Sequence, residues 1–258
     1  MATGLLVVAV GSATRLLRFA TDTEKTYTGT VRLGVATDTL DADGEVTRSA
    51  PVPTFSLDDA MKVASEFIGP QQQVPPMVSA IKVGGKKLYE LAREGQEIER
   101  QPRDIVVSRF EVSPGHTENS WDFAVTVTPG TYVRVLLSDY AERLGTLGHL
   151  TALRRVSSGA SAVSAAWSLE EIAERASRGE SVLSPARQMV SHFPEVLVDS
   201  EIVLNIRQGK LIDLDVSGDA PYCAAVDKDG ELVAVLRPKN GRWQPDVVLA
   251  SEHPPASS

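Results

Sequence analysis

The pattern of apolar and polar residues predicts several strands in the first half of the chain, two of them by clear alternation. Lys25–Leu33 puts Tyr27 and the other apolar residues on one face and threonines on the opposite face, which is the period of a half-buried strand. Trp121–Val127 repeats this pattern, and Ile105–Val112 is a further expected strand without strict alternation. Leu5–Val10 is apolar without alternation, so we expect a strand that is covered on both faces.

Apolar residues at helical spacing predict four helices, over Ser12–Phe19, from Ser56 to about residue 68, from residue 133 to Gly145, and from Ser168 to about Gly179. Ser168 and the glutamate three residues later form a capping-box pattern. In the second helix the expected apolar stripe consists of Leu57, Ala60, Met61, Ala64 and Ile68.

Strands and helices follow one another without a repeating strand–helix–strand rhythm, which favours an α+β fold. We expect a main domain over residues 1–183, in which residues 71–101, rich in Pro, Gly, Lys and Arg, form an excursion from the core. The composition shifts after residue 184, and two apolar runs flank Asp227–Gly230 as in a hairpin. A small β-rich domain over residues 184–250 and a disordered tail over 251–258 complete the predicted organisation.

Composition limits the possible classes of protein. The chain has 258 residues, of which 42% are hydrophobic and 23% charged, so we expect a folded globular protein. Its longest apolar run is too short to cross a membrane, and no basic residue precedes that run as in a signal peptide. The net charge of -8 argues against a broadly basic nucleic-acid binder and leaves room for a local basic face.

Common metal and cofactor motifs are absent from the sequence. Cys223 is the only cysteine, which excludes a disulfide framework, and we expect it to be a buried apolar side chain rather than a nucleophile. Gly84–Lys87 lacks the spacing of a phosphate-binding loop, and Asp41–Gly44 covers only part of a calcium loop. The scattered histidines are His116, His149, His192 and His253. We therefore expect no metal and no cofactor.

Four short segments carry the candidate chemistry. They are Ala2-Thr-Gly-Leu-Leu6, Lys25-Thr-Tyr27, Gly130-Thr-Tyr-Val-Arg134 and Gly148-His-Leu-Thr-Ala-Leu-Arg-Arg155. Arg134 falls in the first turn of a predicted helix, where the helix dipole disfavours a cation, so we expect a carboxylate nearby. In this order and spacing the four segments closely resemble the TruB family of tRNA pseudouridine synthases.

The resemblance covers about residues 1–175 and includes two further segments, Arg32–Gly44 and Pro76–Arg93. Val78 stands where many relatives carry tyrosine. The resemblance implies a pseudouridine synthase fold with a central, mostly antiparallel sheet flanked by helices. The β-rich C-terminal part resembles the smaller RNA-binding domain of PUA type that such enzymes carry.

The resemblance also implies an activity, the isomerisation of the T-loop uridine of tRNA (position 55) to pseudouridine through an aspartate nucleophile. It assigns Tyr27 to stacking on the flipped base and to movement of the C5 proton, and Tyr132 and Leu153 to the uridine pocket. Arg134 would pair with the nucleophilic aspartate and keep it ionised. The T arm of tRNA is the implied partner, for a monomeric and cytoplasmic enzyme.

A local basic cluster lies within the excursion. Between residues 82 and 93, Glu90 is the only acidic residue beside Lys82, Lys86, Lys87 and Arg93, so this cluster is a candidate contact for RNA phosphates. The alternative is an ordinary solvated loop.

The family's nucleophile motif reads Gly-Thr-Leu-Asp-Pro-X-Ala-Thr-Gly, and the sequence begins at its X position with Met1. Asp38, Asp41 and Asp43 match a different family motif and are not expected to replace the missing aspartate. We expect a misassigned start codon, with a truncated gene product as the alternative, and we expect the chain as written to be inactive. A non-catalytic tRNA-binding or tRNA-folding protein is the competing hypothesis.

Overall fold

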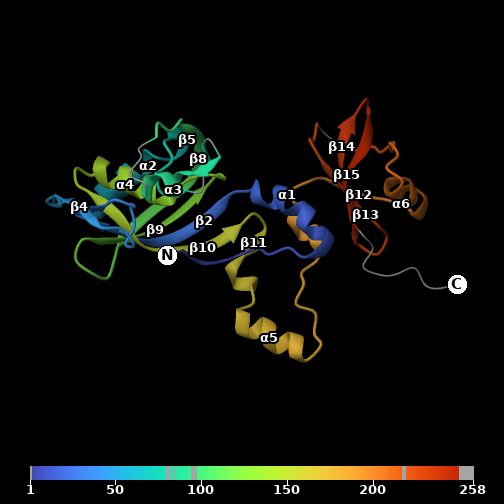
Figure 1. Ribbon diagram of the computed structural model, residues 1–258, viewed down its shortest axis with the longest axis horizontal. Coiled ribbons are helices and arrows are strands. Elements are labelled where there is room, and N and C mark those ends of the chain that lie inside the picture. The colour runs from blue at the N-terminus through green and yellow to red at the C-terminus, as the bar shows by residue number, and fades with distance from the viewer. Residues whose placement is uncertain (1, 80–81, 84, 94–97, 217–218, 250–258) are drawn as a thin grey trace. The chain divides into compact units, whose positions relative to one another are not determined.

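The computed structural model describes residues 2–79, 82–83, 85–93, 98–216 and 219–249 (Figure 1). The chain divides into two compact units. Unit 1 consists of Met1–Leu5 and Thr23–Ser158, and unit 2 consists of Leu6–Asp22 and Gly159–Ser258. The chain therefore passes from one unit to the other three times.

Unit 1 is built on a sheet with the strand order β1-β10-β2-β9-β8-β5. The strands are β1 (Thr3–Gly4), β2 (Lys25–Leu33), β5 (Gly69–Gln73), β8 (Arg103–Pro114), β9 (Ser120–Val127) and β10 (Gly148–Ser158). The β1–β10 pair is parallel and the other pairs are antiparallel. This confirms the mostly antiparallel sheet that was expected.

Two helices, α2 (Leu57–Ser65) and α4 (Val133–Arg143), contribute to the core of unit 1 together with one face of the sheet. Val125 and Val107 of the sheet and Leu137 of α4 are completely buried in this core. Tyr140 is also fully buried, and its hydroxyl donates to the carbonyl of Ala60 at 3.3 Å, which satisfies the polar end of the ring. The remaining elements of the unit are β3 (Val35–Thr37), β4 (Val46–Ser49), β6 (Lys82–Val83), β7 (Lys86–Lys87) and α3 (Leu88–Arg93).

The expected strands over Lys25–Leu33, Ile105–Val112 and Trp121–Val127 and the helices at Ser56 and at residue 133 are confirmed. Ser56 caps α2 in a capping box with Asp59, because each side chain accepts a hydrogen bond from the other residue's backbone N–H. The apolar stripe of α2 is only partly confirmed, because Ala60 and Ala64 are buried whereas Met61 is 49% exposed. Leu57 and Ile68 are exposed to a similar extent.

The expectation of a covered strand over Leu5–Val10 is wrong. Only Thr3 and Gly4 pair with β10, and one further bond joins the Leu5 amide to the carbonyl of Arg155 at 2.8 Å. The chain then leaves the sheet, and Leu6 and Val8 are more than 70% exposed. A continuous apolar run does not specify whether other strands pair with it or cover it. The tertiary structure therefore determines whether such a run is buried or exposed.

Unit 2 holds a second sheet, with the order β12 (Glu195–Leu197), β13 (Cys223–Val226), β14 (Leu232–Lys239) and β15 (Arg242–Val248). This confirms a β-rich C-terminal part and the hairpin around Asp227–Gly230. The other elements of unit 2 are η1 (Gly11–Leu16), α1 (Leu17–Thr21), β11 (Ser161–Ala162), η2 (Val163–Ala165), α5 (Leu169–Ser177), η3 (Ala186–Val190) and α6 (Ser200–Arg207).

The N-terminal helical segment, η1 with α1, belongs to unit 2 rather than to the expected domain of residues 1–183. Leu16 is fully buried in the same cluster as residues of the second sheet. The ring of Phe19 meets the rings of Tyr222 and Phe193 at 4.9 and 5.3 Å between centroids. Burial of these two apolar side chains joins the segment to a sheet that lies some 200 residues later in the sequence.

The excursion begins later than residue 71, because Gln71, Gln72 and Gln73 pair with β8 as part of the main sheet. Beyond it, β6 and β7 form a small hairpin that is followed directly by α3. The expected tail over residues 251–258 lies outside the described residues. No helix in the described part of the chain is both long and apolar enough to cross a membrane.

Candidate active site

The site is organised around the N-terminus of α4. Pro129 and Gly130 turn the chain from β9 into this helix, and Gly130 takes a positive φ of 83°, which a residue with a side chain adopts only with strain. Tyr132 is the N-cap residue but supplies no side-chain cap, and no acidic residue lies in the first turn. Arg134 is therefore a cation at the end of a helix where cations are disfavoured.

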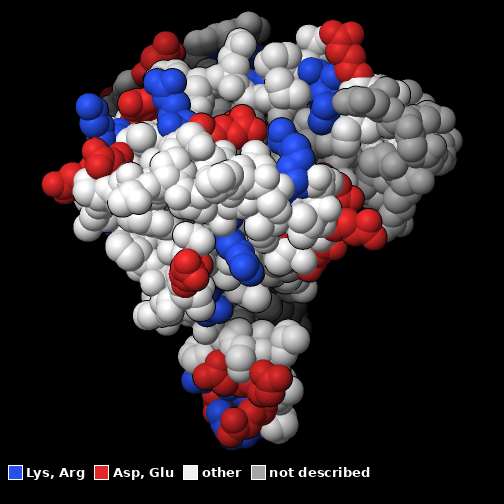
Figure 2. Space-filling view, turned by 90° about the vertical axis from the view of Figure 1, so that its left-hand side faces the viewer, with Lys and Arg blue, Asp and Glu red and all other residues white. Residues whose placement is uncertain are grey.

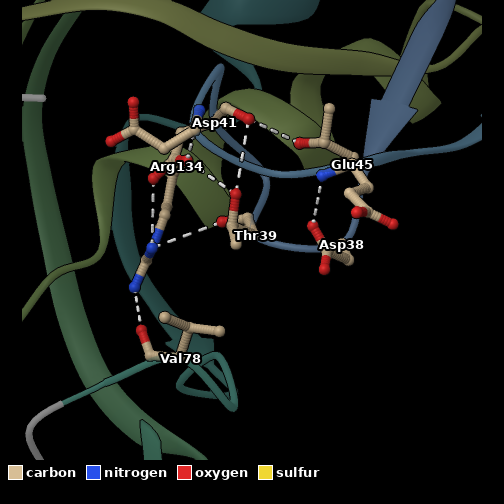
Figure 3. A network of polar contacts seen from close by, with 8 residues as sticks. Asp38, Thr39, Asp41, Glu45, Val78 and Arg134 are labelled. Carbon is tan, nitrogen blue, oxygen red and sulfur yellow. Dashed lines mark hydrogen bonds and ion pairs between the residues drawn. The ribbon is translucent and has the colours of Figure 1, made fainter. Parts of the chain in front are cut away.

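Arg134 is held by three oxygens from two loops (Figure 3). Its Nη1 lies 3.2 Å from Oδ2 of Asp41 and 3.3 Å from the carbonyl oxygen of Thr39. Its Nη2 donates to the carbonyl of Val78. The side chains of Arg134 and Asp41 are only 18% and 14% exposed, so their charges attract one another with less screening than a surface pair.

The loop that carries Asp41 is ordered by its own hydrogen bonds. Oγ1 of Thr39 donates to Oδ1 of Asp41 at 2.6 Å, and Oγ1 of Thr37 donates to the Asp41 carbonyl at 2.7 Å. Leu40 between them has a φ of 62°, a left-handed conformation that is costly for a residue with a side chain. The amide of Leu150 on β10 donates to the Leu40 carbonyl at 3.1 Å and so ties this strained loop to the sheet.

Arg134 keeps donors for a further acceptor. A guanidinium has five N–H groups, and the contacts to Thr39, Asp41 and Val78 use three of them. Among the residues that the structure describes, no hydrogen bond is formed by the remaining Nη2 proton or by Nε–H. A second anion could thus be bound beside Asp41 by the same fixed side chain.

The predicted pocket residues come from three elements of unit 1. Tyr27 lies on β2 and Leu153 on β10. Leu153 pairs with Gly29, so these two residues share a face of the sheet. Tyr27 is two residues before Gly29 on the same strand, and its side chain therefore points to the same face as that of Leu153. Both pack against the core cluster that contains α4. Tyr132 and Arg134 lie at the start of that helix, with the guanidinium carbon of Arg134 6.0 Å from the centre of the Tyr132 ring.

The backbone of the basic cluster is described, but its side chains are not. Lys82 and Lys87 are opposite one another in the β6–β7 hairpin, Lys86 lies beside Lys87 on β7, and Arg93 ends α3. The side chains of these four residues lie outside the described part of the structure, so their contact with RNA stays a prediction. On the face drawn in Figure 2, basic and acidic side chains are interspersed with uncharged surface between them.

Two other titratable residues considered from the sequence, Cys223 and His149, are buried in the interior of the fold. Cys223 is fully buried, and its burial raises the pKa of the thiol to about 12, so it is not a nucleophile at neutral pH. His149 is buried with Nδ1 2.8 Å from the carbonyl oxygen of Val35. Within the described ranges, no three His, Cys, Asp or Glu side chains are grouped so that they could hold a metal ion.

Sequence reasoning did not single out Gln73, at the end of β5, as a residue of the site. Its side-chain oxygen accepts from the amide of Tyr132 at 2.8 Å, and its side-chain nitrogen donates to the Tyr132 carbonyl at 3.2 Å. Gln73 is 5% exposed, whereas its neighbour Gln72 is exposed. Three consecutive glutamines carry no signal that separates the buried one from the others.

Comparison with known proteins identifies the family. Residues 1–133 match the family described as TruB family pseudouridylate synthase (N terminal domain). A curated protein of Psychrobacter cryohalolentis, named tRNA pseudouridine synthase B, is 43% identical over 217 residues, covering 83% of this chain and 60% of the relative. The Bacillus cereus protein of the same name is 39% identical over 262 residues, covering 96% of this chain and 85% of the relative.

The chain spans 60% and 56% of the length of the relatives from Psychrobacter cryohalolentis and Psychrobacter arcticus. Among solved structures, a chain of a Cbf5-Nop10-Gar1 complex is similar with a TM-score of 0.68 and 23% identity, covering 92% of this chain and 66% of that one. At this identity the likeness concerns the fold alone, and it confirms the α+β pseudouridine synthase fold. Together with the sequence match over more than half of its residues, these findings show that the chain belongs to the TruB family of pseudouridine synthases.

Proposed function

We propose that this protein acts as a tRNA pseudouridine synthase on the T-loop uridine, position 55 of the tRNA. The observation that carries the proposal is the set of four family-motif residues gathered in unit 1, namely Tyr27 on β2, Leu153 on β10 and Tyr132 with Arg134 at the start of α4. The names of the curated relatives support tRNA as the substrate. We further propose the T arm as the bound element, a monomeric state and a cytoplasmic location.

The reaction is an isomerisation. The N1–C1′ bond of the uridine breaks, the uracil turns, and a C5–C1′ bond forms, after which C5 loses its proton and N1 ends with one. Atoms and electrons balance without an oxidant, a reductant or a metal. A carboxylate that adds covalently to the nucleoside divides the reaction into easier steps, and the uridine must leave its stack to be reached.

Arg134 is proposed to hold the catalytic carboxylate ionised and in place. Its remaining Nη2 and Nε donors fit a carboxylate, because a guanidinium presents two parallel N–H groups to two oxygens. Asp41 would compensate part of the charge of Arg134 and fix its direction through the 3.2 Å contact. A guanidinium beside a carboxylate favours its ionised form, which suits a nucleophile that must be ionised.

Tyr27, Tyr132 and Leu153 are proposed to enclose the base. An aromatic ring can stack on a flipped pyrimidine, and an apolar side chain such as Leu153 excludes water from the reacting atoms. Each of the three side chains is partly buried, so each retains surface that a ligand could cover.

Residues 1–258 do not include the Gly-Thr-Leu-Asp-Pro motif that holds the family's nucleophile. We therefore propose that the polypeptide 1–258 alone binds T-arm RNA without turning it over. The proposed RNA-contacting residues would equally serve a second candidate function, a non-catalytic tRNA-binding or tRNA-folding protein. The basic cluster at Lys82, Lys86, Lys87 and Arg93 would supply phosphate contacts in either case.

One experiment separates the two functions. Joining a segment that ends in Gly-Thr-Leu-Asp-Pro to Met1 completes the family motif, and we call the product the extended polypeptide. The polypeptide 1–258, the extended polypeptide and its version with Asn in place of the new Asp are each incubated with an unmodified T-arm stem-loop. Pseudouridine formed only by the extended polypeptide supports the synthase.

Tight T-arm binding by all three polypeptides with turnover by none would support the non-catalytic binder instead. Turnover by the polypeptide 1–258 would contradict the proposed identity of the nucleophile. If none of the three binds the T arm, the proposed substrate is wrong.

A further inference from the structure

Gln73 makes an unusual contact with the helix that carries Arg134. Its amide group accepts from the N–H of Tyr132 and donates to the C=O of the same residue, at 2.8 and 3.2 Å. A single side chain thus satisfies both backbone groups of one residue, as a neighbouring strand would. The two residues are 59 positions apart in the sequence, so this is a tertiary contact rather than a local turn.

The contact falls where α4 lacks a cap of its own. The first N–H groups of a helix have no partner within the helix, and a Ser, Thr, Asp or Asn at the N-cap commonly supplies one. Tyr132 occupies the N-cap here and makes no side-chain cap bond. Gln73 fixes the backbone of this N-cap residue from outside the helix, next to a first turn in which Arg134 opposes the helix dipole.

The segment that begins at Gln73 makes a second contact with the site. Five residues after Gln73, the carbonyl of Val78 accepts from Nη2 of Arg134. One stretch of chain therefore holds both the backbone of Tyr132 and the guanidinium of Arg134. This stretch continues directly into the β6–β7 hairpin, which carries the predicted RNA-binding lysines.

Burial makes Gln73 sensitive to the loss of either bond. The residue is 5% exposed, so water cannot easily replace a missing partner, and an unpaired polar group in such a place is strongly disfavoured. An apolar side chain of the same length would fill the same volume but would leave the Tyr132 backbone unfastened. The hydrogen bonds, rather than the volume, are what distinguishes glutamine at this position.

We infer that Gln73 is a positioning residue of the active site. It clamps the N-cap of α4 and thereby sets the place of the Tyr132 ring and the direction of the Arg134 guanidinium. Gln73 does not touch the reacting atoms itself. Its effect on the captured base rests on the proposed function, whereas its effect on Arg134 does not.

The test compares Gln73→Met with Gln72→Met in the polypeptide 1–258. Methionine is close to glutamine in length and lacks its hydrogen-bonding groups, and Gln72 is the exposed neighbour on the same strand, which makes it a matched control. Thermal melts verify that both variants fold. Gln73→Glu, which keeps the acceptor for the Tyr132 amide and loses the donor, gives an intermediate substitution.

The first readout is the nitrogen NMR signal of the Arg134 guanidinium, assigned with Arg134→Lys. In the unaltered polypeptide, hydrogen bonds should slow its rotation and give separate Nη signals. We expect Gln73→Met to merge these signals, Gln73→Glu to broaden them and Gln72→Met to leave them unchanged. Separate signals in a folded Gln73→Met variant would overturn the inference, whatever the RNA measurements show.

The second readout uses a T-arm stem-loop with 5-fluorouridine at the target position. We expect the bound RNA to show a shifted fluorine signal from the captured base, and Gln73→Met to reduce its population about tenfold, since small misplacements in a site have large effects. The dissociation constant should change by less than about twofold, because phosphate contacts dominate affinity.

The RNA outcomes separate the two ideas. If the unaltered polypeptide neither binds this RNA nor shifts the fluorine signal, the proposed function fails, and the Arg134 signals alone decide the role of Gln73. If the unaltered polypeptide captures the base and Gln73→Met captures it equally well, Gln73 is a structural residue only and the inference is wrong.

Discussion

Arg134 and Asp41 form an ion pair at 3.2 Å across 93 residues of sequence, with both side chains largely withdrawn from solvent. The pair joins the first turn of α4 to the loop between β3 and β4. Asp41 provides the negative charge that the N-terminus of α4 would otherwise lack, and the loop gains a fixed cation. The site is therefore assembled by an electrostatic contact between two elements rather than within either one.

The strength of this pair can be measured by a double-mutant cycle with Arg134→Ala and Asp41→Ala. We expect a coupling free energy of about 1–3 kcal/mol in urea unfolding, because removing one partner leaves a poorly solvated charge. The control is the exposed pair of Arg143, on the same helix, with Glu66, for which we expect about 0.2–1 kcal/mol. Equal coupling in both cycles would show that withdrawal from solvent does not matter here.

In the extended polypeptide, Arg134→Ala should lower the turnover of T-arm RNA by about 10²–10³-fold, as expected for the loss of one well-placed electrostatic contact. RNA affinity should change little, because the proposed role is at the carboxylate and not at a phosphate. Single-turnover assays and filter binding measure the two quantities, with Arg143→Ala as the control. A loss of affinity as large as the loss of turnover would make Arg134 an RNA-binding residue instead.

Phe19 should be a core residue of unit 2. Phe19→Ala removes a ring that packs against Phe193 and Tyr222, and we expect it to lower the free energy of unfolding by about 3–5 kcal/mol. Leu197→Ala, at a position in the same unit that is 73% exposed, should change it by less than about 0.5 kcal/mol. If Phe19→Ala changes the free energy of unfolding only slightly in chemical denaturation, the N-terminal helical segment contributes little to the stability of unit 2.

Cys223 offers a pH-dependent test of the second apolar cluster of unit 2, which also contains Ile206 and Leu236. Burial raises the pKa of its thiol from 9.0 to about 12, so between these values the folded state keeps a proton that the unfolded state has released. Stability should therefore fall as the pH rises above 9 and through this window. Comparing the unfolding free energy of the unaltered chain with that of Cys223→Ala isolates this contribution, since the variant lacks the titrating thiol.

The same thiol should resist iodoacetamide at pH 8 in the folded protein and react quickly in denaturant, because the thiolate is the reactive form. Phe19→Ala should accelerate the labelling, because a less stable unit 2 unfolds and exposes Cys223 more often. Rapid labelling of the folded, unaltered chain would contradict the burial of Cys223.

The basic cluster predicts a salt dependence of RNA binding. Replacing Lys82 and Lys87 together by alanine should make the negative slope of log K against log salt shallower. Its magnitude should fall by about 0.7–0.9 for each phosphate that the protein then leaves unneutralised. Replacing Lys228 and Lys239 of unit 2, which lie outside the excursion, is the control. An unchanged slope in the first variant would support the ordinary solvated loop.

Local pattern was sufficient for much of unit 1 and for the family. The alternation in Lys25–Leu33 specifies a half-buried strand, and Ser56 and Ser168 each mark a helix start through hydrogen bonds that reach only three residues ahead. The spacing of the motifs around Tyr27, Arg134 and Leu153 indicates the family and the candidate site residues. These features depend on neighbours in sequence, which is why the sequence alone reveals them.

Tertiary structure decided which distant residues complete the site. The Arg134 contact with Asp41 and the Gln73 contact with Tyr132 join residues 93 and 59 positions apart, and no local periodicity encodes them. The exposed run after Leu5 and the packing of Phe19 in unit 2 follow the same rule. Burial and pairing of such residues depend on which surface the folded chain brings against them, and a one-dimensional pattern does not specify that surface.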